Sequence, residues 1–381
     1  MCEHLDKAEQ AYAEGSTLDR RTLVLGAGAT LAAAGLAGSL MRPGSAAAHD
    51  PSAGQSATPA APAAAGPSVL LETVTGPVSS ASISWALAHE HFFVDFFLPS
   101  DPKYMDVNWS DVTGACTASA NDLRAQGVDL FIDWTNMGVG RNPLLLRDVS
   151  RRSGMNILCA TGIYKNRIPP ALVGAPIGEI ADHFYRELTK GIGETPIRAG
   201  WVKCATTEDG PTAADTRVHA AAARAAKRAG CTISLHSPHY EATKAVMKTL
   251  EGEGFDLRRF VWGHSQVSSV EDHKKVAAKG AMVQWDAISA SKDEFFGGPT
   301  DDESMLDRIQ EMIAAGYGDR IVVSADASVF VNPAIYQYDR QNTYVYRTFV
   351  PKLKERIGDQ RTQMVLRDNV VKAFRRGDNV S

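Results

Sequence analysis

Eight short apolar runs, each followed by a segment with helical patterning, constrain the fold of this 381-residue chain more than any other feature. The runs that we predict as strands cover residues 83–88, 128–133, 156–160, 200–205, 232–236, 260–264, 281–286 and 321–324. Uninterrupted apolar character is typical of parallel strands, because both faces of a parallel sheet are buried. Helical patterning lies between the runs, for example over residues 212–228 and 303–315.

The number of strand–helix units decides between two kinds of parallel sheet. Eight units in one domain favour a closed (β/α)8 TIM barrel over an open, doubly wound sheet, and such barrels commonly have ~250 residues. No GxGxxG motif follows the first strand, which argues against a dinucleotide-binding fold. We therefore predict an α/β protein whose single catalytic domain is a barrel over residues 68–381.

Residues 1–67 have the composition of an export signal followed by a linker. Arg20 and Arg21 precede an Ala/Gly-rich apolar run over residues 23–40, and three alanines before His49 suit a signal-peptidase cut. We predict a twin-arginine signal peptide over residues 1–48 and a disordered Ala/Pro linker over residues 49–67. An uncleaved membrane anchor is the alternative, because ~20 apolar residues can span a bilayer. The predicted location is periplasmic, cell-surface or secreted.

Charge and cysteine content exclude several classes of function. The formal net charge is −4 and the charges are scattered, so no basic stripe is available for nucleic acid. The five cysteines form no CxxC pair, which argues against a cysteine zinc site. We interpret Cys159, Cys204 and Cys231 as small buried apolar residues, because each lies in or beside a predicted strand.

The first predicted strand ends in the sequence His89-Glu90-His91. Residues two apart point to the same side of a strand, so His89 and His91 converge while Glu90 faces away. Two adjacent imidazoles inside a barrel usually share a metal ion. The pattern alone is equally compatible with two unconnected histidines.

Four more polar residues lie within or directly after other apolar strands: Lys203, His236, His264 and Asp326. Burying an unpaired lysine ammonium costs several kcal/mol, so Lys203 either reaches solvent at an edge or has a depressed pKa and is chemically modified. A single buried histidine is more often a core residue than a ligand. Several such residues at the carboxyl ends of separate strands indicate a site, because barrel enzymes carry their catalytic residues there.

The ordered set His89-x-His91, Lys203, His236, His264 and Asp326 resembles the metal constellation of the phosphotriesterase family, in the amidohydrolase superfamily. Further similarities lie at Asp133-Trp134-Thr135, Gly140-Arg141, residues 160–164, Gly263-His264-Ser265 and Arg367-Asp368-Asn369. The resemblance extends over roughly residues 69–375.

The resemblance implies a binuclear centre with two divalent metals, zinc first among them. His89, His91 and Asp326 would hold one metal, and His236 and His264 the other. Lys203 would react with carbon dioxide and bridge both metals as a carbamate. A bridging water, whose pKa two metals can lower towards ~7, would be the nucleophile. Lys203 and Asp326 are the implied catalytic residues, with Asp326 accepting the proton.

Departures from the family pattern bear on the substrate. Val267 stands where well-studied phosphotriesterases and lactonases have Asp, and Ala287 stands where they have His or Arg after the seventh-strand Asp286. Asn369 is followed by Val370 instead of Pro. These changes spare the metal ligands but weaken the case for organophosphate hydrolysis. We predict a metal-dependent hydrolase of a lactone or carboxylic ester. The alternatives are a phosphotriester or N-acyl amide hydrolase, a non-hydrolytic metal-dependent barrel enzyme and a metal-poor ligand-binding barrel.

Other residues receive weaker assignments. Tyr164 matches a family tyrosine that borders the metals and is the candidate for substrate binding, although a packing role is equally compatible. Further candidates for the pocket are Arg167, His239, Tyr240 and Trp285, whereas His183, His219 and His273 fall in helical segments and are predicted to be solvated. The expected partner is a small-molecule substrate, with no stable membrane insertion after signal removal, and a homodimer remains open.

Overall fold

The computed structural model of the protein describes residues 68–377, apart from residues 166, 290–297, 300 and 335–340. The predicted signal peptide and linker therefore lie outside the described residues. Within the described part, no helix combines the length and the apolar character that crossing a membrane requires.

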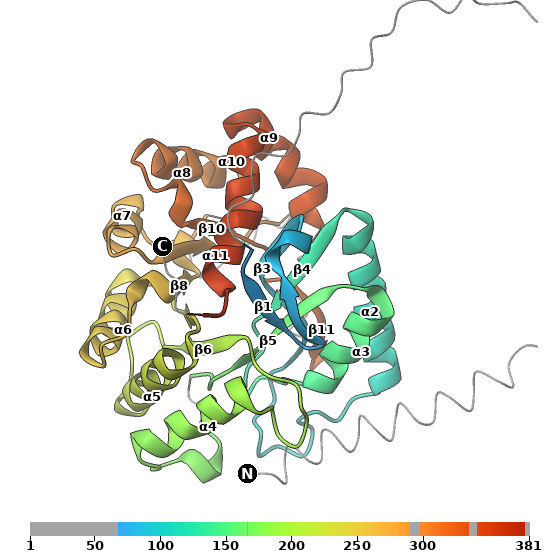
Figure 1. The fold of residues 1–381 in the computed structure, drawn as a ribbon, viewed down its shortest axis with the longest axis vertical. Helices are drawn as coiled ribbons and strands as arrows, with labels where there is room; N and C mark the ends of the chain where they lie inside the picture. The colour runs from blue at the N-terminus through green and yellow to red at the C-terminus, as the bar shows by residue number, and fades with distance from the viewer. Residues whose placement is uncertain (1–67, 166, 290–297, 300, 335–340, 378–381) are drawn as a thin grey trace, which may run out of the picture.

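The core of the molecule is one parallel sheet wrapped into a barrel and surrounded by helices (Figure 1). Its strands are β3 (Trp85–Asp95), β4 (Val128–Asp133), β5 (Asn156–Thr161), β6 (Trp201–Ala205), β7 (Ile233–His236), β8 (Phe260–Gly263), β9 (Met282–Trp285), β10 (Ile321–Val323) and β11 (Ser328–Asn332). Each of the eight predicted runs overlaps one of these strands, although β3 extends seven residues beyond its predicted run, and the (β/α)8 barrel is confirmed.

The eighth strand of the barrel consists of two segments, β10 and β11. β10 pairs with β9, whereas β11 pairs in parallel with β3, joining Ser328 to His91 and Asn332 to Asp95. The sheet is thus closed through β11, which the sequence analysis did not predict although Val329–Val331 is apolar. The connection between the two segments contains Asp326, whose φ of 48° is left-handed.

Helices connect successive strands and pack around the barrel. They are α2 (Trp109–Ala125), α3 (Pro143–Ser153), α4 (Ile177–Thr189), α5 (Ala213–Ala229), α6 (Tyr240–Gly252), α7 (Val270–Ala278), α8 (Asp302–Ala314), α9 (Val350–Ile357), α10 (Asp359–Gln363) and α11 (Asn369–Phe374). Two π-helical turns, η7 (Val345–Phe349) and η8 (Met364–Asp368), flank α9 and α10. Short 3-10 turns are η1 (Ser80–Ser82), η2 (Pro170–Leu172), η3 (Leu257–Arg259), η4 (Ser265–Val267) and η5 (Gly318–Arg320).

Local chemistry sets the ends of these helices. α5 begins with a capping box, in which Thr212 and Asp215 satisfy each other's backbone N–H groups. It ends at Gly230, whose φ of 60° is the left-handed conformation that commonly terminates helices. The predicted helix over residues 212–228 is thereby confirmed within one residue.

Two apolar clusters build the barrel. The larger cluster lies between strands and helices, and all four described cysteines are buried, as predicted for Cys159, Cys204 and Cys231. The smaller cluster fills the inside of the barrel with alternate strand residues such as Leu130, Ile132 and Trp201. Phe374 of α11 belongs to this inner cluster and contacts Trp201 edge-on, so α11 closes one end.

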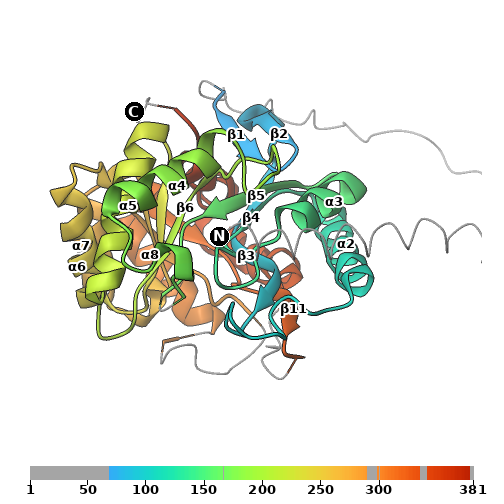
Figure 2. The ribbon, with the colours of Figure 1, turned by 90° about the horizontal axis from the view of Figure 1, so that it is seen from below.

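An antiparallel hairpin of β1 (Leu70–Thr73) and β2 (Gly76–Ser79) precedes the barrel and was not predicted. The N–H of Val74, just after β1, donates to the carbonyl of Ile157 near the amino end of β5 (2.9 Å). Figure 2 shows the hairpin and β11 at opposite ends of the molecule. The hairpin therefore covers the amino ends of the strands and leaves their carboxyl ends accessible to loops.

Candidate metal centre

His89 and His91 point to the same side of β3, as the alternation of strand residues predicts. The Nε2 atoms of His89 and His91 lie 3.2 Å and 3.1 Å from Oδ1 of Asp326. Glu90 points the other way and accepts hydrogen bonds from Ser324 Oγ (2.7 Å) and from the N–H groups of Ala325 and Ala327 (2.9 Å each). Glu90 thus attaches the connection that carries Asp326 to the same strand that carries the two histidines.

His236 and His264 form a second group beside the first. His236 is the last residue of β7, and His264 follows β8 with a left-handed φ of 61°. Nδ1 of His236 lies 2.6 Å from Nε2 of His264. The rings of His89 and His264 are 5.1 Å apart between centroids, so the two groups adjoin. Positive φ values at non-glycine residues such as His264 and Asp326 are concentrated at functional sites.

Asp286, at the end of the seventh strand run, fixes two of the imidazole rings. Its Oδ2 lies 2.7 Å from His89 Nδ1, and its Oδ1 lies 2.7 Å from His264 Nδ1. A carboxylate accepts hydrogen bonds, so each ring carries its proton on Nδ1 and presents the Nε2 lone pair to the centre. Asp286 was not predicted as a site residue, although a carboxylate at a strand's carboxyl end is the signal that identified Asp326.

Thr135 orients His91 in the same way. Its hydroxyl donates to the carbonyl of Phe93 (3.1 Å) and accepts from His91 Nδ1 (2.7 Å). His91 therefore also presents Nε2 to the centre. Three of the four histidines are held in the tautomer that a metal requires.

Lys203 is buried in the middle of β6, with 2% of its surface exposed. Its Nζ lies 3.8 Å from the ring centroid of Trp134, a cation–π distance. Within the described part of the chain, Nζ has no hydrogen bond or ion pair. Burial lowers the pKa of Lys203 to about 7, although Asp326 and Asp286 act to raise it. An amine with this pKa is substantially uncharged at neutral pH.

Trp134 forms the floor of the centre and was noted in the sequence only as part of the family resemblance. Its ring stacks on His89 with centroids 3.7 Å apart and an angle of 13°. Its Nε1 donates to the carbonyl of Ala88 (2.6 Å). Gly263 permits this packing, because a Cβ at that position would lie 3.0 Å from the Trp134 ring.

Burial and charge set the protonation of the candidate ligands. Burial lowers the pKa of His89 to about 3, and burial together with His264 lowers the pKa of His236 well below its usual value. Burial alone would raise the pKa of Asp326, but His89 and a hydrogen bond from His91 outweigh burial and lower that pKa. At neutral pH the centre therefore offers the neutral imidazoles of His89 and His236 and the carboxylate of Asp326, which are groups that bind zinc and similar ions.

The separations between ligand atoms test whether an ion fits. Atoms bound to one tetrahedral ion at ~2.0–2.1 Å lie ~3.3 Å apart. The distances of 3.1 Å and 3.2 Å from Asp326 to His91 and His89 match this value. The 2.6 Å between His236 and His264 is shorter, so these two rings must part slightly to share an ion. His89, His264 and Asp286 also lie within reach of one ion, but Asp286 contacts the Nδ1 atoms and serves to orient the rings.

Tyr164 borders the centre, with its hydroxyl 3.2 Å from His236 Nε2. Of the four weaker candidates for the pocket, three make structural contacts and one faces solvent. Trp285 is buried against His273, Tyr240 packs near Trp262, and Arg167 donates to the carbonyls of Phe96, Phe97 and Gly138. His239 is exposed, 4.0 Å from Glu208. The first three thus have structural contacts that the sequence did not reveal.

The prediction that the helical histidines are solvated was wrong. His183, His219 and His273 are 5%, 1% and 0% exposed. His219 contacts the carbonyl of Ala205 (3.1 Å), and His273 that of Ser265 (2.6 Å). Each lies on the helix face that packs against the barrel, where burial lowers the pKa of His219 and of His273 and keeps the rings neutral.

Comparison with known proteins places the chain in a family. The model of the phosphotriesterase family matches residues 69–374. The phosphotriesterase homology protein of Mycobacterium tuberculosis is 29% identical over 330 residues, covering 80% of this chain and 98% of that protein. An aryldialkylphosphatase of Saccharolobus solfataricus is 32% identical over 203 residues, covering 52% and 63%. An N-acetyltaurine hydrolase of Xenopus tropicalis is 23% identical over 336 residues, covering 78% and 96%.

Solved structures agree with this assignment. A mutant PTE-like lactonase from Deinococcus radiodurans superimposes with a TM-score of 0.70 and 26% identity, covering 80% of this chain and 99% of that one. Family, fold and the histidine–aspartate groups point in one direction. The chain belongs to the phosphotriesterase family and is a metal-dependent hydrolase.

Proposed function

We propose that the protein hydrolyses a lactone or a carboxylic ester at a binuclear metal centre. One observation carries the proposal: four histidines and one aspartate from four strands of the barrel converge around a buried lysine. They are His89, His91, His236, His264, Asp326 and Lys203. This donor set suits divalent metals, with zinc as the first candidate.

Each of these residues takes a defined place in the proposal. His89, His91 and Asp326 would hold one ion, and His236 and His264 would hold the other. Lys203 would supply a further carboxylate ligand after reaction with carbon dioxide: its nitrogen bonds to the carbon, the π electrons of one C=O bond move to oxygen, and a proton leaves the nitrogen to solvent. The pKa of about 7 supports this step, because the free amine is the reactive form. Carboxylation also replaces a buried cation, which is costly, with an anion.

The chain's own groups then divide the work of catalysis. When bound, the two ions would activate water and polarise the substrate's carbonyl oxygen. Asp326 directs its Oδ1 towards the centre and accepts the proton of the attacking water. The hydroxyl of Tyr164, beside His236, is placed to hydrogen-bond a substrate oxygen. Trp134 closes the inner side of the centre against water.

The substrate class rests on the site and on the relatives. Val267 and Ala287 stand at two positions where the resemblance leads us to expect residues of a proton relay. Neither side chain can carry a proton, and this disfavours a phosphotriester as substrate. The structural similarity to a PTE-like lactonase favours a lactone. An N-acyl amide with an anionic leaving group is the second candidate, because Lys165 is half-buried with its Nζ 5.9 Å from the Tyr164 ring centroid. The similarity to an N-acetyltaurine hydrolase supports this candidate.

A substrate panel with one metal-loaded preparation tests the proposal. We expect kcat/KM to be highest for a lactone or aryl ester, and lower for N-acyl amides and phosphotriesters. Chelation should abolish hydrolysis, and added zinc should restore it. His236→Ala should lose metal and activity, whereas His239→Ala, at an exposed position, should retain both. A preference for phosphotriesters, or activity that survives chelation, would contradict the proposal.

A further inference from the structure

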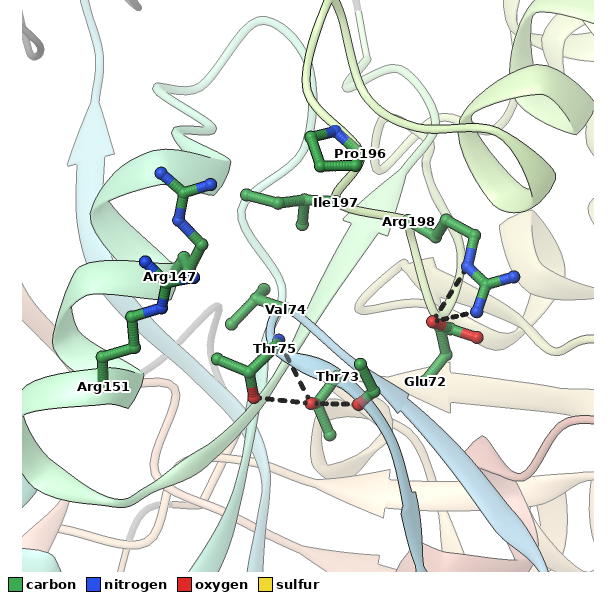
Figure 3. Close-up of a pocket in the computed structure, with 10 residues that line it drawn as sticks. Glu72, Thr73, Val74, Thr75, Arg147, Arg151, Pro196, Ile197 and Arg198 are labelled. Carbon is green, nitrogen blue, oxygen red and sulfur yellow. Dashed lines mark hydrogen bonds and ion pairs between the residues drawn. The ribbon is translucent and has the colours of Figure 1, made fainter.

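A cavity of about 220 Å³ lies at the amino end of the barrel, between the β1–β2 hairpin, α3 and the segment before β6 (Figure 3). Arg147 and Arg151 line it from α3, and Arg198 lines it from the opposite side. Arg198 precedes β6, whereas Lys203 lies further along that strand towards its carboxyl end. At ~3.3 Å per residue, about 15 Å of chain separates the cavity from the metal centre. The cavity is therefore a separate feature.

The charges that face this cavity are unbalanced. Arg198 is neutralised by Glu72, whose Oε1 lies 2.9 Å and 3.1 Å from two of its guanidinium nitrogens. Arg147 and Arg151 have no ion pair or hydrogen bond to any residue that the structure describes. The Nε of Arg147 is buried without a hydrogen-bond partner. The guanidinium groups of Arg147 and Arg151 thus line one side of a small cavity without a partner among the described residues.

Arg147 is partly buried, whereas Arg151 is exposed. Like charges one helical turn apart repel each other, and a buried N–H without an acceptor is rare in folded proteins. The repulsion between the two side chains is relieved by an anion with several oxygen acceptors, which the guanidinium nitrogens that line the cavity can reach. Guanidinium groups bind phosphate and carboxylate through paired hydrogen bonds, which a single chloride ion cannot accept in the same way.

The remaining wall limits the size of such an anion. Val74 and Ile197 supply apolar surface, and the hydroxyl of Thr75 lies at the rim, 3.2 Å from Thr73 Oγ1. The volume is below the ~300–1,000 Å³ of sites for drug-sized ligands and corresponds to roughly seven water molecules at ~30 Å³ each. A phosphate group fits with room for a few further atoms.

We propose that this cavity binds a phosphate group, either as free phosphate or on a small organic molecule, between Arg147 and Arg151. The bound anion neutralises both guanidinium groups and links α3 to the hairpin that covers the amino ends of the strands. The site is independent of the hydrolytic reaction proposed above.

Thermal unfolding of the metal-loaded protein tests the proposal, with inorganic phosphate and glycerol 3-phosphate as probes at constant ionic strength. The test variant is Arg147→Gln/Arg151→Gln. The matched control is Arg152→Gln, an exposed arginine of α3 that does not line the cavity. Both probes should raise the Tm of the wild type and the control, and calorimetry should show at least tenfold weaker binding to the double variant. Tighter binding of glycerol 3-phosphate than of phosphate identifies a phosphorylated small molecule as the ligand class.

The same variants distinguish phosphate bound in this cavity from phosphate bound at the candidate metal centre. Stabilisation that is equal in the wild type and the double variant comes from elsewhere and overturns the proposal, as does no stabilisation at all. Unchanged circular dichroism and ester hydrolysis establish that the double variant is folded. If it is not, Arg151→Gln alone, at an exposed position, should weaken phosphate binding, and undiminished binding to that variant equally overturns the proposal.

Discussion

Asp286 orients two of the histidines of the candidate metal centre. Asp286→Ala removes the acceptors of His89 Nδ1 and His264 Nδ1, so both rings can turn or change tautomer. Loss of such an outer partner typically costs 10–100-fold in metal affinity, and we expect about that loss here. Competitive titration with a chelating dye measures the affinity. Asp272→Ala removes a partly buried carboxylate whose partners are Ser269 and Lys275, and it serves as the control. Equal affinities in the two variants would mean that Asp286 does not orient the rings.

The pKa of Lys203 predicts how pH controls activation. Burial lowers this pKa from 10.5 to about 7, so the free amine amounts to about one tenth at pH 6 and nine tenths at pH 8. Metal-free protein given zinc and a fixed concentration of dissolved carbon dioxide should therefore regain activity several-fold faster at pH 8. Because the folded chain binds fewer protons than the unfolded chain between pH 7 and 10.5, its stability should also rise with pH there.

Lys203→Glu supplies a carboxylate without carbon dioxide and is the control for this pH effect. Its recovery of activity should be independent of dissolved carbon dioxide. Wild-type protein that recovers equally fast in carbon dioxide-free buffer would rule out the carbamate.

The residues at the ends of apolar runs could be predicted from the sequence, whereas the residues that act between strands could not. His89, His91, His236, His264 and Asp326 were identifiable because a polar residue at the end of an apolar run is conspicuous. The effect of Asp286 depends on distances across three strands, which no local pattern contains. The helical histidines were wrongly predicted to be solvated. The ends of a helix and the polarity of its residues do not show which of its faces packs on the barrel.

At the level of elements, the break in the eighth strand is what brings Asp326 to the histidines. β10 and β11 pair with different neighbours, and Glu90 of β3 holds the connection through three hydrogen bonds. β11 could not be separated from a loop in the sequence because it follows β10 without an intervening helix. The hairpin before the barrel was not predicted either, because its two strands are short and only partly apolar.

Glu90→Gln tests this coupling between β3 and the eighth strand. The amide has one oxygen where the carboxylate has two, so it can accept hydrogen bonds at only one of the two oxygen positions. Either the N–H of Ala327 loses its acceptor, or the N–H of Ala325 and the hydroxyl of Ser324 lose theirs. An unsatisfied buried donor costs about 1–3 kcal/mol, and we expect that decrease in the free energy of unfolding, measured by urea denaturation. Metal content should also fall, because Asp326 is displaced. Glu241→Gln, at an exposed position, should change neither quantity.

On the scale of the whole molecule, the two ends of the barrel have different tasks. The carboxyl end carries the candidate metal centre, whereas the amino end is closed by the hairpin, by α11 and by Asn369, whose amide donates to the carbonyls of Gly318 (2.9 Å) and Ile321 (2.6 Å). The alternation of strand and helix patterns in the sequence was sufficient to predict the barrel, because eight buried parallel strands have few other arrangements. The closure of its amino end depends on contacts between the two ends of the described chain, such as the bridge of Leu70 with Arg376, which the alternation of strand and helix patterns does not reveal.

The location of the folded enzyme is a further prediction for the whole chain, and it rests on residues 1–48. We propose that Arg20 and Arg21 direct export through the twin-arginine pathway, because they precede a weakly apolar run that ends in small residues. That route carries folded proteins, so a barrel that needs metals to function can acquire them in the cytoplasm. Arg20→Lys/Arg21→Lys keeps the charge but removes the guanidinium pair that the machinery recognises. We expect the double variant to accumulate in the cytoplasm as active enzyme with its signal uncleaved, as seen by fractionation and mass spectrometry. Arg42→Lys, beyond the apolar run, should export normally with a mature end near His49. Normal export of the double variant would exclude this pathway and leave the membrane anchor or another route as the explanation of the apolar run.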